Sequence, residues 1–180
     1  MRLKSAKWYR VLSPRPVVLI STMDSKGVFN AAPFSFVMPV SSDPPLIAFA
    51  SNPNHDTVRN ILETEDFVVN IPGREILKQL WICANDFPTG TSEIKEAGLT
   101  EEPSIKVKSP KIAECFAHFE CKLFGKYPVG DHLLIIGKVL EADVKDEFMG
   151  RKKYLIARAN PLMHITGDEF GLLGKIVRAE

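Results

Sequence analysis

The sequence has little of several features that mark large classes of proteins. It contains three cysteines among 180 residues, and they form no C-x-x-C pair. This count and spacing favour reduced thiols in a cytoplasmic protein over a disulfide framework. No apolar stretch approaches the roughly 18 residues that a membrane-spanning helix needs. The charged N-terminus is not followed by the apolar segment of a secretion signal. We therefore expect no association with a membrane.

An excess of charge of one sign is also lacking. The 23 Lys and Arg residues nearly balance the 22 Asp and Glu residues, and the basic run is confined to Arg151-Lys152-Lys153. Nothing in this distribution favours nucleic acid as a partner. With 45% hydrophobic and 25% charged residues and no repeat or linker, the sequence predicts one globular domain over residues 1–180.

Two kinds of site motif are missing. No G-x-G-x-x-G follows the first predicted strand, so a nicotinamide cofactor would bind without a Rossmann site in this chain. Metal sites often combine two ligands at short spacing with a second such pair. Cys115, His118 and Cys121 do not form this pattern. We therefore expect no metal site.

The apolar pattern predicts more strands than helices. Segment 17–22 is rich in β-branched residues without polar alternation, as in a buried strand, whereas Val58, Ile61 and Leu62 have helical spacing. Predicted strands are 17–22, 28–40, 46–50, 67–71, 105–108, 117–124 and 133–144, with connections at 24–27, 41–45 and 125–131, and predicted helices are 5–13, 57–63, 75–84 and 93–97. Because strands and helices do not alternate regularly, we expect a mainly β protein with a closed or nearly closed antiparallel barrel.

One stretch combines features of a strand and of a binding surface: Asn30-Ala31-Ala32-Pro33-Phe34-Ser35-Phe36. Its small residues allow a ligand to approach the backbone closely. Pro33 lacks an amide for a sheet ladder, which predicts an edge, a bulge or a lip at this point. An ordinary β-bulge explains the same residues without a ligand.

Three segments in this order carry a resemblance to a known family: 15–22 (RPVVLIST), 30–35 (NAAPFS) and 55–61 (HDTVRNI). Together they resemble the flavin reductase-like, FMN-binding split-barrel family, which includes flavoredoxins and small NAD(P)H:flavin oxidoreductases. The resemblance extends almost to the C-terminus. It implies an antiparallel, Greek-key-like split barrel with a few peripheral helices, FMN as cofactor, and a homodimer with each FMN in a groove near the subunit interface.

The helix that begins near Asp56 is a candidate phosphate site, because a helix N-terminus offers free amides and a positive dipole end. Ser51, Asn52 and Thr57 gather there as hydroxyl and amide donors. The Asp56 carboxylate would repel a phosphate, so we expect it to point away. Asn54 or Asp56 is the expected N-cap, and on spacing alone the whole group is explained as a capping cluster. The resemblance favours phosphate binding.

The resemblance implies further contacts with FMN. Asn60 would face the phosphate or the ribityl chain, and Ser35 would donate to either of them, although a solvated side chain explains Asn60 equally well. The ring would lie along Asn30, Ala31 and Ala32. The predicted cofactor-binding residues are Asn30, Ala31, Ala32, Pro33, Phe34, Ser35, Ser51, Asn52, Thr57 and Asn60.

His132 is the predicted catalytic residue. It follows Gly130 and Asp131, and the resembled family often has Gly-Asp-His there, with the imidazole near the flavin or the path of the nicotinamide. A strand-edge histidine that meets solvent is the alternative. His164 is expected to be structural. Phe170 stands where related proteins place an aromatic side chain against the cofactor of the partner subunit, and it has no phenolic hydroxyl.

Hydride transfer to a flavin needs no protein nucleophile, so the lack of a Ser-His-Asp set is neutral. The leading hypothesis is an FMN protein that takes hydride from NADH or NADPH and reduces free flavin, ferric iron or a redox-protein partner. The alternative is a flavoredoxin-like electron carrier without NAD(P)H activity. A third reading, a barrel that has lost its cofactor, is disfavoured by the retention of Asn30, Ser35, Thr57 and Asn60.

Overall fold

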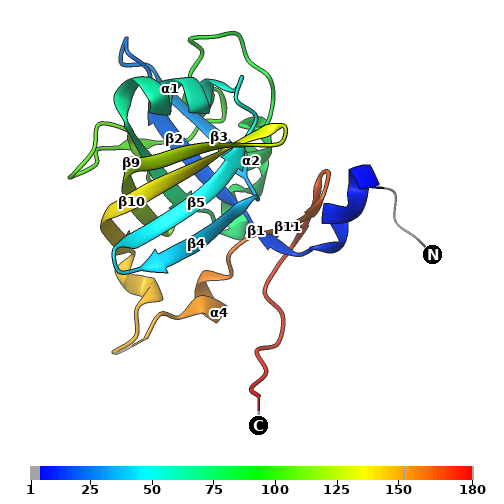
Figure 1. Cartoon of the computed structure of the whole chain (residues 1–180). Helices are drawn as coiled ribbons and strands as arrows, with labels where there is room; N and C mark the ends of the chain where they lie inside the picture. The colour runs from blue at the N-terminus through cyan, green and yellow to red at the C-terminus, as the bar shows by residue number, and fades with distance from the viewer. Residues whose placement is uncertain (1–4, 152, 180) are drawn as a thin grey trace.

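The computed structural model of the protein describes residues 5–151 and 153–179. Its main feature is a seven-stranded antiparallel sheet in the order β3-β2-β6-β9-β10-β5-β4 (Figure 1). The strands are β2 (Val18–Met23), β3 (Phe29–Phe34), β4 (Val37–Ser42), β5 (Pro45–Ser51), β6 (Asp66–Ile71), β9 (Ala117–Val129) and β10 (His132–Val144).

The connection between β3 and β4 dictates the shape of this sheet. The two strands form its opposite edges, yet only Ser35 and Phe36 separate them in the chain. The sheet must therefore curl until its edges approach each other. In agreement, the ring of Phe34 on β3 lies 5.0 Å from that of Phe49 on β5, the neighbour of β4. The result is the antiparallel split barrel that the sequence predicts, open along a seam that we define as Pro33, Phe34, Ser35 and Phe36.

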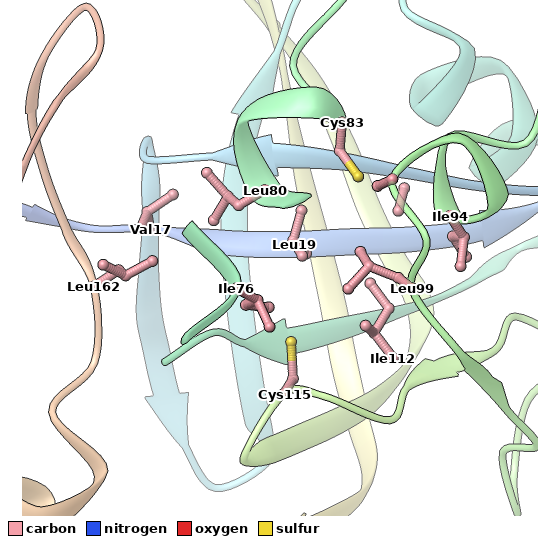
Figure 2. Close-up of a cluster of buried hydrophobic side chains, with 12 residues drawn as sticks. Val17, Leu19, Ile76, Leu80, Cys83, Ile94, Leu99, Ile112, Cys115 and Leu162 are labelled. Atoms are coloured by element: carbon pink, nitrogen blue, oxygen red, sulfur yellow. The ribbon is translucent and has the colours of Figure 1, made fainter. Parts of the chain in front are cut away.

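Two hydrophobic cores explain why the residues of β2 do not alternate. Val18 and Ile20 point into the barrel, whose core they share with Phe67 and with Ile61 of α1 (Asp56–Thr64). Leu19 points outward into a second core, which the shorter helices cover (Figure 2). This core includes Leu80, Cys83, Ile94, Leu99, Ile112 and Cys115. Both faces of the strand are buried, so every position is apolar or small.

Short helices and small sheets complete the fold. The helices are η1 (Ser5–Val11), η2 (Arg74–Ile76), α2 (Leu77–Ile82), α3 (Glu93–Glu96), η3 (Asp146–Phe148) and α4 (Ile156–Ala159). A two-stranded sheet joins β7 (Glu101–Glu102) to β8 (Lys111–Ile112), and a three-stranded sheet joins β1 (Arg15–Pro16), β11 (Met163–Thr166) and β12 (Glu169–Gly171). Figure 1 shows this last sheet and η1 as an arm beside the barrel. Within the described residues no helix has the length and apolar character needed to cross a membrane.

The structure corrects several predicted boundaries. The expected single strand 28–40 is two strands, and its break falls at Ser35–Phe36. Pro33 lies inside β3 opposite Leu19, with no bulge in this pairing; an edge strand tolerates proline because one side needs no ladder hydrogen bond. Segments expected as loops are shorter. A two-residue turn at 43–44 connects β4 to β5, and another at 130–131 connects β9 to β10.

The predicted strand at 105–108 is wrong. This segment is a loop, because buried carboxylates bind its amides in place of a neighbouring strand. Glu120 accepts hydrogen bonds from the amides of Ile105 (2.9 Å) and Lys106 (2.6 Å). Asp66 accepts hydrogen bonds from the amides of Lys108 and Ser109, both at 3.1 Å. Carboxylates from two distant strands thus fix this segment in place of a sheet.

Candidate functional site

The seam opens into a hollow of about 290 Å³, which we call the seam hollow. It brings together six of the predicted site residues from the ends of β3, β5 and β10. These six are Pro33, Phe34, Ser35, Ser51, Asn52 and His132, and Phe36, Ala50 and His55 complete the lining. Segments far apart in the sequence thus meet where the barrel is open.

A second hollow of about 250 Å³ adjoins it at the start of α1; we call it the helix-end hollow. Pro33, Phe34 and His55 line both hollows, which places them along one continuous surface. Asn30, Ala32 and Thr57 line the helix-end hollow together with residues of the 83–87 loop and Glu93. Two predicted residues line neither hollow: Ala31 and Asn60 are buried, with exposed fractions of 0% and 2%.

The N-terminus of α1 is not capped by a side chain. His55, and not Asn54 or Asp56, is the N-cap residue, and it makes no capping hydrogen bond. Asp56 is the first helical residue and forms an ion pair of 2.8 Å with Arg59, so its carboxylate is neutralised next to the helix end. The Val58 amide donates to the His55 carbonyl oxygen at 3.0 Å, so this helix end offers an anion the amides of Asp56 and Thr57 and the positive end of the helix dipole.

A buried hydrogen-bond network fixes α1 against the barrel. Asn30 Oδ1 accepts hydrogen bonds from the hydroxyls of Thr57 (3.3 Å) and Thr22 (3.4 Å), and Asn60 Nδ2 donates to the Thr22 hydroxyl at 3.0 Å. Asn60 is thus neither solvated nor open to a ligand. Since the Thr57 hydroxyl donates inward, the donor that Thr57 can offer to a phosphate is its backbone amide.

His132 lines the seam hollow. Its ring centroid is 5.7 Å from that of Phe36, and its Nδ1–H donates to Asp131 at 2.7 Å. This hydrogen bond lowers the pKa of the Asp131 carboxyl. His132 also lines a larger apolar hollow of about 670 Å³ between the barrel and η1, the arm hollow, to which Trp8, Tyr9 and Met38 contribute. The imidazole is therefore within reach of two adjoining spaces.

Sequence reasoning missed two polar residues of the site. His164, expected to be structural, has its Nδ1 2.9 Å from the Ser35 hydroxyl. Glu93 is 8% exposed and lines the helix-end hollow, and burial raises the pKa of its carboxyl. The sequence around Glu93 predicts only a short helix, and nothing in it points to the distant strand beside which the carboxyl lies. His164 and Phe170 pack together within this chain, with ring centroids 5.4 Å apart.

The thiols and metal-type ligands do not form a second centre in the described residues. Cys83, Cys115 and Cys121 are free and buried, and burial raises their pKa values, that of Cys83 to about 12. Thiols of this kind are poor nucleophiles. Across residues 5–151 and 153–179, no group of three His, Cys, Asp or Glu side chains is arranged to hold a metal ion.

Comparison with known proteins identifies the family. The profile described as "Flavin reductase like domain" matches residues 9–171. The chain belongs to the flavin reductase-like family. One relative in this family is an uncharacterized protein from Methanothermobacter thermautotrophicus, which is 41% identical over 163 residues, covering 87% of this chain and 77% of the relative.

Solved structures agree with the family and the fold. The nitrilotriacetate monooxygenase component B from Bacillus cereus superposes with a TM-score of 0.92 at 26% identity, covering 99% of this chain and 95% of that chain. The 2-nitrobenzoate 2-nitroreductase NbaA from Pseudomonas fluorescens gives 0.88 at 26% identity, with 99% and 92% coverage. An FMN-binding protein from Thermus thermophilus, at 15% identity, shares the fold alone, with a TM-score of 0.84 and 100% and 98% coverage.

Proposed function

We propose that this member of the flavin reductase-like family binds FMN and is an NAD(P)H-dependent oxidoreductase. It would take hydride from NADH or NADPH and reduce free flavin, ferric iron or a redox partner. The observation that carries the proposal is the uncapped N-terminus of α1, which opens beside the seam of the barrel. The 2-nitroreductase among the related structures and the FMN-binding protein of the same fold support it.

The residues present fit FMN in three respects. The amides and dipole of α1 suit a phosphate, and the Arg59 ion pair removes the repulsion expected from Asp56. Ser35, Ser51 and Asn52 offer polar groups to a ribityl chain along the seam hollow. Pro33 and Phe34 form the apolar wall shared by the two hollows, which suits the face of a flat ring.

FMN, when bound, supplies the centre that accepts hydride and releases electrons. The chain's own residues then bind, orient and exclude water. The seam residues and the start of α1 hold the two ends of the ligand at a fixed distance, because the Asn30–Thr57 hydrogen bond ties β3 to the helix. His132 lies where a second molecule would approach, and its Nε2 is available to bind a carboxamide or to exchange a proton.

We also propose a cytoplasmic homodimer. Buried free thiols suit a reducing compartment. Large apolar side chains lie exposed on the arm, among them Trp8 (61% exposed) and Leu12 (67%), and such a patch suits a second copy of the chain.

The decisive experiment is the visible spectrum of the purified protein, followed by NADH and then NADPH without oxygen. We expect a flavin spectrum that one donor bleaches within a catalytically useful time. A bound flavin that neither donor bleaches would favour the electron carrier. No flavin, and none taken up when FMN is added, would overturn the proposal.

A further inference from the structure

Ser35, His164 and Arg15 form a hydrogen-bonded set between the seam and the arm sheet. The Ser35 hydroxyl lies 2.9 Å from His164 Nδ1, and an Arg15 guanidinium nitrogen lies 3.2 Å from the same Nδ1. His164 Nε2 lies 3.2 Å from the carbonyl oxygen of Gly167. Ser35 lines the seam hollow and also the arm hollow, so its oxygen borders the proposed ligand site.

These contacts determine where the protons lie. A carbonyl oxygen can only accept, so His164 Nε2 carries a hydrogen. A guanidinium can only donate, so Nδ1 is the acceptor. Burial and the Arg15 charge lower the pKa of His164, in keeping with a neutral ring. The one lone pair of Nδ1 is thus shared by two donors, of which the Ser35 hydroxyl at 2.9 Å is nearer than Arg15 at 3.2 Å. Ser35 gives its hydrogen to Nδ1, and its own lone pairs are left to face the hollows.

Arg15 is itself held in one place. It is 8% exposed, and its other terminal nitrogen donates to the carbonyl oxygens of Tyr9 (3.0 Å) and Leu12 (2.8 Å). Its guanidinium carbon lies 5.6 Å from the ring centroid of Phe36. A cation fixed in this way keeps Nδ1 unprotonated. It also makes His164 a poor base, so Ser35 is not an activated nucleophile.

We propose that Arg15 and His164 are positioning residues that turn the Ser35 hydroxyl into a hydrogen-bond acceptor for a donor group on the phosphate-free part of the bound flavin. The proposal rests on the proposed function. The donor is a ribityl hydroxyl or the ring N3–H, which share this chemistry. A phosphate, which only accepts, is excluded as the partner of Ser35. This role differs from the sequence-based prediction, in which Ser35 donates a hydrogen bond to the phosphate or to the ribityl chain.

The first test compares Ser35→Ala with the unaltered protein in binding FMN, riboflavin and lumiflavin. We expect a loss of about three- to tenfold, as for one hydrogen bond, and the same loss for FMN as for riboflavin. Lumiflavin lacks the ribityl chain. If Ser35→Ala also weakens the binding of lumiflavin, the donor is the ring N3–H; if lumiflavin binds as tightly as to the unaltered protein, the donor is a ribityl hydroxyl. Loss for FMN alone, or none for any flavin, would overturn the proposal. Ser25→Ala, in the exposed turn after β2, is the matched control.

The second test separates positioning from mere packing. His164→Leu removes the acceptor, whereas His164→Asn keeps an amide oxygen near the place of Nδ1. We expect the leucine variant to lose flavin affinity as Ser35→Ala does, the asparagine variant to recover it, and Ser35→Ala combined with His164→Leu to lose no more than either alone. Additive losses, or equal losses in the leucine and asparagine variants, would show that His164 does not act through Ser35.

A third measurement does not depend on flavin. Nitrogen-15 NMR of the imidazoles should show His164 as the neutral Nε2–H form at neutral pH, and Arg15→Leu should shift its titration upward. An Nδ1–H form would overturn the proton assignment even if flavin binds. If instead the NMR result holds while no flavin binds, the proposed function has failed and Ser35 has no flavin partner, whereas the proton assignment of His164 stands.

Discussion

At the scale of single residues, Glu93 is the most unusual group in the site. Its carboxyl is buried at the wall of the helix-end hollow, and Oε2 has no hydrogen-bond partner among the described residues. Burial raises its pKa, so the folded protein holds this proton to a higher pH than the unfolded chain does. Folding stability therefore falls as the pH rises from the ordinary glutamate pKa through the raised value.

Replacing Glu93 by Gln removes this titration. We expect Glu93→Gln to be more stable than the unaltered protein at neutral pH, by about 1 kcal/mol, and the difference to vanish below the ordinary glutamate pKa. Urea unfolding across this pH range measures it, with Glu96→Gln on the exposed face of α3 as control. A difference that does not change with pH would mean that the Glu93 carboxyl does not titrate in this way.

His132 gives a second prediction at this scale. It lines the seam hollow and is not part of the polar network under α1. We expect His132→Ala to lower the rate of reduction by NAD(P)H about 10²-fold, as for loss of a group that handles protons, and to leave FMN affinity unchanged. Single-turnover reduction and flavin titration measure the two quantities. Weaker FMN binding at an unchanged rate would instead make His132 a cofactor-binding residue.

At the scale of the element, the start of α1 is the proposed binding site for the phosphate. The Arg59–Asp56 pair keeps a carboxylate from acting as a bare negative charge next to the helix end. We expect Arg59→Ala to weaken FMN about two- to fivefold, in line with the energy of one charge at a helix terminus, and to leave riboflavin unaffected. Adding Asp56→Asn to this variant should restore FMN binding. An equal loss for both flavins would show that phosphate does not lie there.

The spacing of apolar residues predicts those helices and strands whose conformation depends on residues close to one another in the sequence. The α1 helix and the buried strands β2 and β6 appear within a residue or two of their predicted places, because their apolar spacing fixes period and burial. Residues 105–108 fail for the opposite reason. The amides of Ile105 and Lys106 donate to Glu120, which lies more than ten residues further along the chain, on β9. A carboxylate buried on β9 leaves no signal in the segment whose conformation it sets.

The same limit applies to the site. Pro33, Phe34, Ser35 and His132 are marked in the sequence by family motifs and line one hollow; their contact with FMN stays a prediction. The neighbours of these residues depend on how the sheet closes. Asn60 looks like a ligand-facing residue on its helix, but the barrel directs it into a buried network with Thr22. His164 reaches Ser35 only because β11 pairs with β1 next to the seam.

At the scale of the whole molecule, the two-residue link between β3 and β4 brings the two edges of the sheet together without pairing them. Pro33 and Ser35 of the seam are partly exposed and Phe36 is exposed, whereas Phe34 is buried. The start of α1 lies beside them, because His55 lines the same hollows as Pro33. One topological feature thus supplies both the apolar wall and the anion end of a ligand site. The arm adds Arg15 and His164, which come from the two ends of the sequence.

The arm also gives a prediction about assembly. Trp8, Leu12 and Met38 are 61%, 67% and 55% exposed and gather around the arm hollow, a cost that a second copy of the chain would remove. We expect light scattering to give about twice the chain mass of 20.1 kDa, and Trp8→Glu with Leu12→Glu to give the monomer. Ile105→Glu, at a residue 71% exposed on the distant loop, should leave the dimer intact.

Because the family resemblance places FMN near the subunit interface, the monomeric variant should also bind FMN more weakly. A mass of 20.1 kDa for the unaltered protein would show that the arm does not join two copies of the chain.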